Sequence, residues 1–285
     1  MKIKDFETSY KPTWCPGCGN FGIWIAIKNA LVELGLRPEQ VLMVHGIGCS
    51  SNGANFSKTY SWHSLHGRGV PTAVGAKLAN KDLTVIALSG DGDGYGEGMS
   101  HFIHAIRGNA DITYITHDNK MYSLTTGQAS PTSEKGFKTK STPDGLIEKS
   151  ANPMSLALAA GGTFVARGFA GDAENLKETI KAAINHKGFS LVDAFQPCVT
   201  FNKLNTFKWY FDRLYNINKQ ANYDTGDIEA AHKASLVWGK KIPYGIFYQK
   251  ARDTYGSNLP QLKGQALIKR KMQVRNLDQL TKEFA

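Results

Sequence analysis

Hydrophobic positions along the first two hundred residues form two alternating kinds of segment. Short apolar runs bounded by Gly, Asp or Pro occupy 41–44, 83–88, 112–116 and 191–195. Runs of this length predict buried strands. Longer amphipathic stretches, which predict helices, occupy 21–34, 71–79, 97–106, 153–160 and 173–184. The alternation predicts an α/β fold in which a parallel sheet is flanked by helices.

The pattern changes near residue 201. Aromatic side chains crowd a basic segment at 201–215, few β-like runs follow, and residues 219–285 are polar. We therefore expect a domain over 1–200 and a C-terminal extension over 201–285 that packs at a subunit interface. Within this extension, residues 219–285 are expected to be helical or irregular. No apolar run reaches the roughly 18 residues of a membrane span, and no secretory h-region is present. These features predict a cytoplasmic protein without a membrane partner.

The composition and charge of the chain limit the kinds of binding partner that we expect. The chain has 41% hydrophobic and 20% charged residues, as in ordinary globular proteins. Its formal net charge of +10 suits a nucleic acid, an acidic protein partner or simple solubility. No zinc-finger or RNA-recognition signature accompanies the charge, so we expect an acidic protein partner and no nucleic acid.

The chain has four cysteines, Cys15, Cys18, Cys49 and Cys198, which make one complete tetrathiolate set. Disulfides are not expected in a chain without a signal peptide. One Cys-x-x-Cys pair joined by two distant single cysteines is less typical of structural zinc than of an iron–sulfur cluster bound by loops. On spacing alone, four unrelated buried cysteines remain the plain alternative.

A Gly-rich acidic loop suggests a second site. Gly90, Asp91 and Gly92 follow the second predicted strand, and Asn119 follows the third. Parallel strands end at one edge of a sheet, where open α/β folds bind ligands. Carboxylate and amide oxygens suit Mg²⁺, while glycines and the start of the helix near Glu97 suit phosphate. A lone Gly-Asp-Gly is often only a tight turn, but the spacing to Asn119 favours a metal–diphosphate site.

That spacing resembles the thiamine diphosphate motif. The chain is similar, from about Trp14 to Trp209, to the β subunits of 2-oxoacid:ferredoxin oxidoreductases, whose motifs it carries in order. The motifs are Trp14-Cys-Pro-Gly-Cys-Gly19, Gly46-Ile-Gly-Cys-Ser50, Leu65-His-Gly-Arg68, Gly90-Asp-Gly-Asp93, Asp118-Asn119, Thr126-Gly-Gln-Ala-Ser-Pro-Thr132 and Cys198-Val-Thr-Phe-Asn202.

The resemblance implies the diphosphate-binding module of the thiamine diphosphate-binding fold. It implies that Cys15, Cys18, Cys49 and Cys198 hold a [4Fe–4S] cluster. It also implies that Asp91, Asn119 and the Met121 carbonyl hold Mg²⁺. The residues expected to line the thiamine diphosphate are Ile47, Gly48, Cys49, Ser50, His66, Gly90, Gly92, Asp93, Ser123 and Leu124.

The resemblance further implies coenzyme A-dependent oxidative decarboxylation of 2-oxoglutarate or pyruvate to an acyl-CoA and CO₂, with electrons passed to ferredoxin. The family places the pyrimidine-binding domain and its ylide-activating glutamate on an α subunit, so we expect half an active site here and assign no catalytic residue. Some relatives carry a substrate-binding lysine shortly after the third cysteine. This chain has Ser50, Ser51 and Asn52 there. Lys58 or an arginine of the partner is our candidate instead.

Two departures and two alternatives stand beside this interpretation. Ser123 stands where relatives often have glycine, and Thr126 stands at a position that varies among them. A non-oxidative thiamine diphosphate decarboxylase subunit would share Asp91 and Asn119 but would not need the thiols. A zinc-stabilised nucleic-acid-binding protein would use the thiols and the charge but leaves the Gly-rich loop unexplained.

Overall fold

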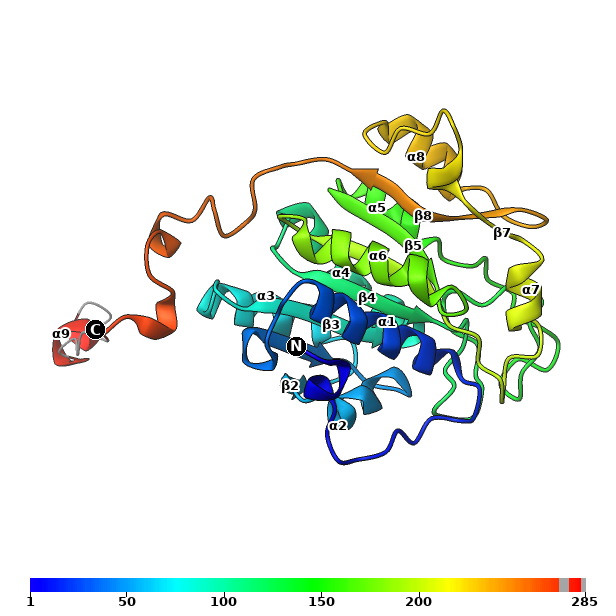
Figure 1. The fold of residues 1–285 in the computed structure, drawn as a ribbon, viewed down its shortest axis with the longest axis horizontal. Coiled ribbons are helices and arrows are strands. Elements are labelled where there is room, and N and C mark those ends of the chain that lie inside the picture. Colours follow the sequence, from blue (N-terminus) through cyan, green and yellow to red (C-terminus); the bar gives the residue numbers. More distant parts are fainter. Residues whose placement is uncertain (272–276, 283–285) are drawn as a thin grey trace.

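An eight-stranded sheet forms the centre of the molecule, in the order β2-β1-β3-β4-β6-β5-β8-β7 (Figure 1). The computed structural model describes residues 1–271 and 277–282. The strands are β1 (Val41–His45), β2 (Tyr60–His63), β3 (Thr84–Gly90), β4 (Thr113–Asp118), β5 (Phe164–Phe169), β6 (Ser190–Phe195), β7 (Leu214–Asn216) and β8 (Ile242–Gln249). From β2 to β5 all pairs are parallel, whereas β8 pairs antiparallel with β5. The mostly parallel α/β sheet confirms the predicted fold class.

Helices precede, connect and follow the strands. They are α1 (Gly19–Glu33), α2 (Gly53–Phe56), α3 (Gly69–Ala79), α4 (Met99–Gly108), α5 (Pro153–Ala159), α6 (Ala173–Asn185), α7 (Phe207–Phe211), α8 (Ile228–Ser235) and α9 (Leu277–Lys282). The five predicted helices are present, although α1 and α3 begin two residues earlier than expected. Asn152 and Asp172 cap α5 and α6 as their residue types predict, because each side chain accepts a backbone N–H of the first turn.

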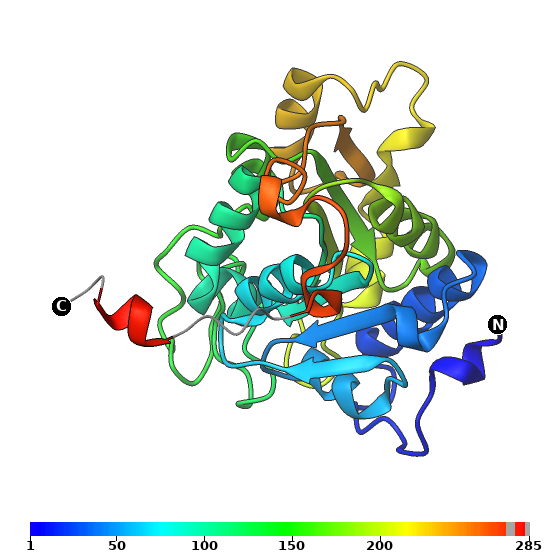
Figure 2. The ribbon, with the colours of Figure 1, turned by 90° about the vertical axis from the view of Figure 1, so that its left-hand side faces the viewer.

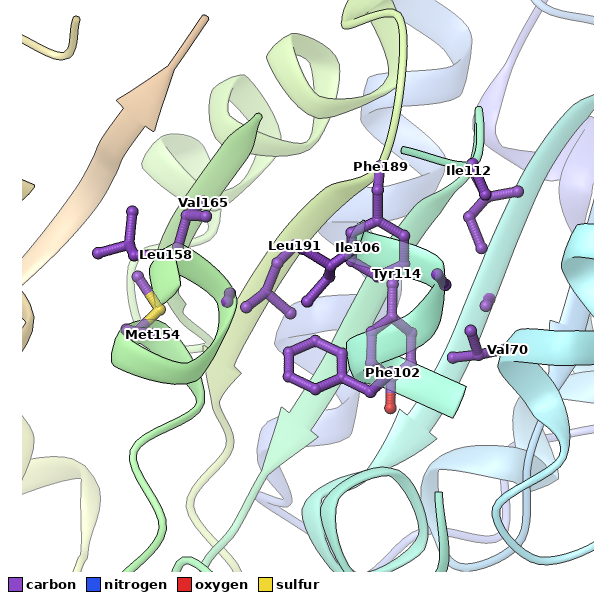
Figure 3. Packing of buried hydrophobic residues seen from close by; sticks show 14 of the residues in the cluster. Val70, Phe102, Ile106, Ile112, Tyr114, Met154, Leu158, Val165, Phe189 and Leu191 are labelled. Atoms are coloured by element: carbon purple, nitrogen blue, oxygen red, sulfur yellow. The ribbon is translucent and has the colours of Figure 1, made fainter. Parts of the chain in front are cut away.

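Helices cover both faces of the sheet, and each face has its own apolar core. One core joins α3, α4, α5 and α8 to alternate residues of the strands, with Phe102, Tyr114 and Phe189 at its centre (Figure 3). The other joins α1 and α6 to the opposite residues, including Ile86 and Val192. Burial of each large side chain stabilises the fold by about 1.5–3 kcal/mol. The two cores hold the strand ends, and therefore the loops that follow them, in fixed positions.

Four strands were not predicted, and each lacks the usual signal. β2 is an edge strand with all four residues exposed, so it has no apolar pattern. β5 is fully buried but is interrupted by Arg167 and Gly168. β8 contains Pro243 and Gly245 and pairs with β5 through a bulge, while β7 has only three residues. The expectation of helical or irregular structure beyond residue 219 is therefore wrong for β8, which extends the sheet.

The C-terminal segment after β8 leaves the sheet at one end of the molecule (Figure 1). It runs past α3, which η7 (Leu267–Lys269) contacts (Figure 2). The predicted extension over 201–285 includes residues 272–276 and 283–285, which lie outside the described part. Among the described residues, no helix is both long and apolar enough to cross a membrane.

Candidate functional site

Four neighbouring strands deliver their following loops to one edge of the sheet. β1, β3, β4 and β6 are adjacent and parallel, so their carboxyl ends lie side by side. The loops after them carry two of the four cysteines, the Gly-rich acidic loop and Asn119. The helical segment after β3 begins earlier than predicted, because a π-helix, η4 (Gly92–Glu97), precedes α4. Its N-cap position is Asp91, so the acidic loop itself starts the helix.

A cavity of about 130 Å³ lies among these loops and collects all the residues predicted for cofactor and Mg²⁺. They are Ile47, Gly48, Cys49, Ser50, His66, Gly90, Asp91, Gly92, Asp93, Asn119, Met121, Ser123 and Leu124. Tyr122 and Thr125 line the same cavity and were not predicted. Only their place in the loop after β4 could have indicated them.

Asp91 is held with one oxygen free. Its side chain is fully buried, and Oδ2 accepts hydrogen bonds from the hydroxyls of Ser130 and Thr132, both at 2.5 Å. Oδ1 has no hydrogen-bond partner among the described residues. Burial, and then the charge of Asp118, raise the pKa of Asp91. A buried acceptor without a partner is rare, and one lining a cavity fits a bound cation.

Asn119 is fixed by its own loop. Its Oδ1 accepts the backbone N–H of Met121 at 3.0 Å, and its Nδ2 donates to Gln196 at 3.0 Å and to Ser123 at 3.2 Å. These contacts orient the amide oxygen, which keeps a second lone pair. Asn119 and Asp91 therefore both lie in the wall of the cavity with defined side-chain orientations.

The glycines of the acidic loop have different structural roles. A Cβ on Gly92 would lie 2.4 Å from the ring of Tyr122, so only glycine fits there. Gly90 lines the cavity, and a Cβ on it would have only the Ser50 hydroxyl near it, at 3.9 Å. The loop thus packs closely on one side and leaves space for a ligand on the other.

Asp93 joins the acidic loop to the loop after β2. Its Oδ1 accepts the backbone N–H of Gly67 at 2.8 Å and lies 3.3 Å from Nδ1 of His66. Its Oδ2 is buried without a hydrogen-bond partner among the described residues. Burial raises the pKa of Asp93, and the hydrogen bond from Gly67 opposes this effect. His66 is thereby held at the mouth of the cavity.

A buried charged network lies behind Asp91. The Thr132 hydroxyl contacts Asp91 and also Oδ1 of Asp118, at 2.8 Å. Lys120, which has a left-handed backbone (φ 60°), donates to the Thr132 carbonyl at 3.1 Å and lies 4.5 Å from the ring of Trp238. Thr132 thus connects Asp91 to Asp118. The motif at 126–132 is part of the family resemblance, but the resemblance assigns Thr132 no role.

The four cysteines line a second cavity, of about 190 Å³. Cys198 is buried, Cys18 and Cys49 are half-buried, and Cys15 is exposed. Burial first, and then the neighbouring thiols, raise the pKa of Cys18 to about 12. The thiols surround a space rather than a point, since no group of three or more His, Cys, Asp or Glu side chains in 1–271 and 277–282 is gathered tightly enough for one metal ion.

Neighbouring side chains orient the sulfur atoms and their loops. Gln196 donates to Sγ of Cys18 at 3.3 Å, and Ser123 donates to Sγ of Cys49 at 3.4 Å. The indole of Trp14 donates to the Cys49 carbonyl at 2.6 Å. Trp14 therefore ties the first cysteine loop to the loop after β1.

The first cavity, called the oxygen-lined cavity from here on, and the second, called the sulfur-lined cavity, share a wall. Cys49, Ser123 and Leu124 line both of them. Gln196 hydrogen-bonds Asn119 on the oxygen-lined side and Cys18 on the sulfur-lined side. A ligand in one cavity would therefore lie one side chain away from a ligand in the other.

Comparisons with known proteins agree with this geometry. Residues 46–194 match the family model of the thiamine pyrophosphate enzyme C-terminal, TPP-binding domain. Residues 198–264 match the family model for the C-terminal part of the β chain of pyruvate ferredoxin oxidoreductase. Fold and site thus define a thiamine pyrophosphate-binding module with an attached C-terminal region.

The most similar proteins include β subunits of one enzyme type. The chain is 45% identical over 269 residues to subunit β of 2-oxoacid:ferredoxin oxidoreductase 1 of Aeropyrum pernix, covering 91% of this chain and 85% of that protein. It is 47% identical over 246 residues to the KorB subunit of 2-oxoglutarate oxidoreductase of Mycobacterium tuberculosis, covering 86% and 64%.

A solved structure is similar over nearly the whole chain. It is 2-oxoglutarate:ferredoxin oxidoreductase from Magnetococcus marinus with 2-oxoglutarate, coenzyme A and succinyl-CoA bound. The TM-score is 0.89 at 40% identity, covering 92% of this chain and 90% of that chain. This chain therefore belongs to the family of 2-oxoacid:ferredoxin oxidoreductase β subunits.

Proposed function

We propose that this chain supplies the half-site that binds thiamine diphosphate, Mg²⁺ and a [4Fe–4S] cluster in a coenzyme A-dependent 2-oxoacid:ferredoxin oxidoreductase. The single observation that carries the proposal is the wall shared by the oxygen-lined and sulfur-lined cavities. A non-oxidative decarboxylase needs only the first cavity. Cys49 in both walls suits an enzyme that removes electrons where the substrate reacts.

The oxygen-lined cavity fits Mg²⁺ and a diphosphate. Asp91 would bind the metal through the Oδ1 atom that lacks a partner among the described residues. Asn119 would bind it through its oriented amide oxygen and Met121 through its carbonyl, which completes an oxygen set of the kind Mg²⁺ prefers. The space beside Gly90 would admit phosphate oxygens.

The sulfur-lined cavity fits an iron–sulfur cluster. Four thiols around one space match the four thiolates that such a cluster uses. Iron would favour the thiolate form of Cys18, whose thiol is otherwise protonated because burial raises its pKa. The hydrogen bonds from Gln196 and Ser123 are of the kind that tune a cluster's potential.

Thiamine diphosphate supplies the carbanion chemistry that decarboxylates a 2-oxoacid, and a [4Fe–4S] cluster supplies single-electron transfer. The chain's own residues would hold these groups on the two sides of the shared wall. Ser123 links the two sites directly, since its hydroxyl contacts both the Asn119 amide and the Cys49 sulfur. Exposed Cys15 leaves one side of the sulfur-lined cavity open to an electron acceptor such as ferredoxin.

The substrate is 2-oxoglutarate or pyruvate, and the Magnetococcus relative supports 2-oxoglutarate. Lys58, our candidate for the substrate carboxylate, does not line the oxygen-lined cavity. An arginine of the partner subunit is therefore the better candidate. Of the described residues that line this cavity, only His66 has a basic side chain.

An α subunit would complete the site with the pyrimidine-binding domain and the activating glutamate. Apolar side chains are exposed beside the oxygen-lined cavity, namely Leu65 (75% exposed) and Leu124 (52% exposed). These suit burial against a partner subunit. The basic charge of the chain suits an acidic ferredoxin.

The test is reconstitution. The chain should be produced anaerobically, alone and together with an α subunit of its family, and analysed for iron, sulfide and thiamine diphosphate. We expect iron and sulfide in equal amounts, and ferredoxin reduction with a 2-oxoacid and coenzyme A only in the complex. Zinc in place of iron would overturn the cluster, and turnover by the chain alone would overturn the half-site.

A further inference from the structure

A cavity at the opposite edge of the sheet belongs to neither site. Its volume is about 550 Å³, and it lies between α3, the loops that precede β4 and β6, and the segment after β8. These loops precede their strands, whereas the loops of the oxygen-lined cavity follow theirs. The length of the strands therefore separates the two cavities. We propose that this entry-edge cavity binds a nucleoside polyphosphate.

The wall of the cavity is preformed. Asn109 is fully buried in a left-handed conformation (φ 53°), and its Nδ2 donates to the carbonyls of Arg252 and Asp253, both at 3.1 Å. The Asn109 carbonyl also accepts the backbone N–H of Tyr255 at 3.1 Å. The Oδ1 atom of Asn109 accepts hydrogen bonds from the Thr163 hydroxyl and the Phe189 backbone N–H. Asn109 therefore ties the segment after β8 to the residues just before β5 and β6.

The floor of the cavity is apolar and includes an aromatic ring. Val74 and Leu78 of α3, Ala110 and Leu262 supply the aliphatic surface. Tyr255 lines the same space and leaves nearly half of its surface exposed. A flat, partly apolar base can pack against such a floor, because aromatic stacking tolerates different bases.

The rim of the cavity carries unneutralised positive charge. Lys77 pairs with Asp111 at 3.0 Å, and the Arg252 guanidinium donates to the last carbonyls of α4. The remaining cations, Lys81, Lys187 and Lys263, have no ion pair with any described carboxylate.

The nearby carboxylates do not cancel this charge. Asp82, next to Lys81, is engaged by Lys269 at 2.6 Å, which leaves Asp253 as the one lining carboxylate without an ion pair among the described residues. Three ammonium groups around one opening favour a polyanion, and lysine binds phosphate as a point charge.

Together the floor and the rim define the ligand class. An apolar floor with a ring and a basic rim suits a purine base joined to two or three phosphates. The volume lies within the range of small-molecule sites. Coenzyme A contains an adenosine diphosphate group, so the chemistry has two sources, a free nucleotide or coenzyme A, which only a binding test can separate.

The test uses the complex of this chain with its α subunit and measures binding of ADP, ATP, coenzyme A, pyrophosphate and adenosine by calorimetry. We expect ADP or ATP to bind, and the double variant Lys81→Ala/Lys187→Ala to weaken this by about tenfold. Tyr255→Ala should weaken ADP but leave pyrophosphate unchanged. The control is Lys240→Ala/Lys241→Ala, two exposed lysines before β8, which should bind as the unmodified complex does.

Each possible result of this test either supports or contradicts the proposal. If neither ADP nor coenzyme A binds at millimolar concentration, or if both bind equally to all variants, no nucleotide site exists here. If pyrophosphate binds as tightly as ADP with the same losses, the cavity takes anions only and the nucleotide assignment is wrong. If coenzyme A alone responds to the lysine variants, the adenosine diphosphate group comes from coenzyme A. Iron and thiamine diphosphate contents should be equal in all variants, so the result does not depend on the proposed function.

Discussion

The oxygen-lined and sulfur-lined cavities share a wall but are assembled in opposite ways. Asp91 and Asn119 follow directly on neighbouring buried strands, and their side chains are already hydrogen-bonded in place. The cysteines come from loops 183 residues apart in sequence, from Cys15 to Cys198, and one of them is exposed. The first cavity is thus set by the sheet, whereas the second depends on loops that its ligand would help to hold together.

The largest effect is expected when a metal-binding side chain of the oxygen-lined cavity alone is removed. Asp91→Ala removes the buried carboxylate while leaving all thiols in place. We expect complete loss of thiamine diphosphate and of 2-oxoacid turnover in the complex, with unchanged iron and sulfide. Cofactor release on denaturation and iron analysis provide the measurements. If iron were lost together with the cofactor, the cavities would form one cooperative unit.

The reciprocal change acts from the sulfur side. Cys198→Ala removes the one buried thiol of the four. We expect a complex that has lost its cluster and ferredoxin reduction but still retains thiamine diphosphate and Mg²⁺. Visible absorption and cofactor content together test this. Full iron content in the variant would show that Cys198 is not a ligand.

A smaller effect is expected when a side chain that only orients Asp91 in the oxygen-lined cavity is changed. Thr132→Val keeps the shape of the side chain but removes the hydroxyl that contacts Asp91 and Asp118. We expect Mg²⁺ affinity to fall by roughly 10–100-fold, because residues that orient a ligand matter almost as much as the ligand. Thr132→Ser retains the hydroxyl and is the matched control. Equal affinity in both variants would mean that Ser130 alone orients Asp91.

Sequence patterns predicted the part of the fold that rests on buried parallel strands. β1, β3, β4 and β6 contain short runs that are mostly apolar and buried, and knowing that parallel strands end at one edge placed Asp91 beside Asn119. β8 could not be predicted in this way, since Pro243 and Gly245 (φ 116°) interrupt its pattern and its partner strand lies about eighty residues away.

The residues that orient the metal and cysteine ligands could not be predicted from the sequence either. Thr132 contacts Asp91 across 41 residues of sequence, and a polar side chain in a loop has no periodicity to reveal its partner. Gln196, which bridges the two cavities, likewise lies near a cysteine without any local signal of that role. Such contacts depend on how loops from different strands meet, which only the assembled sheet determines.

The uncovered strand β2 has a practical consequence. Tyr60 and Trp62 are exposed on a strand whose outer row of peptide groups pairs with no described strand. Edges of this kind recruit other chains and promote aggregation. We therefore expect this edge to promote aggregation of the isolated subunit, and a lysine added on this strand should reduce it.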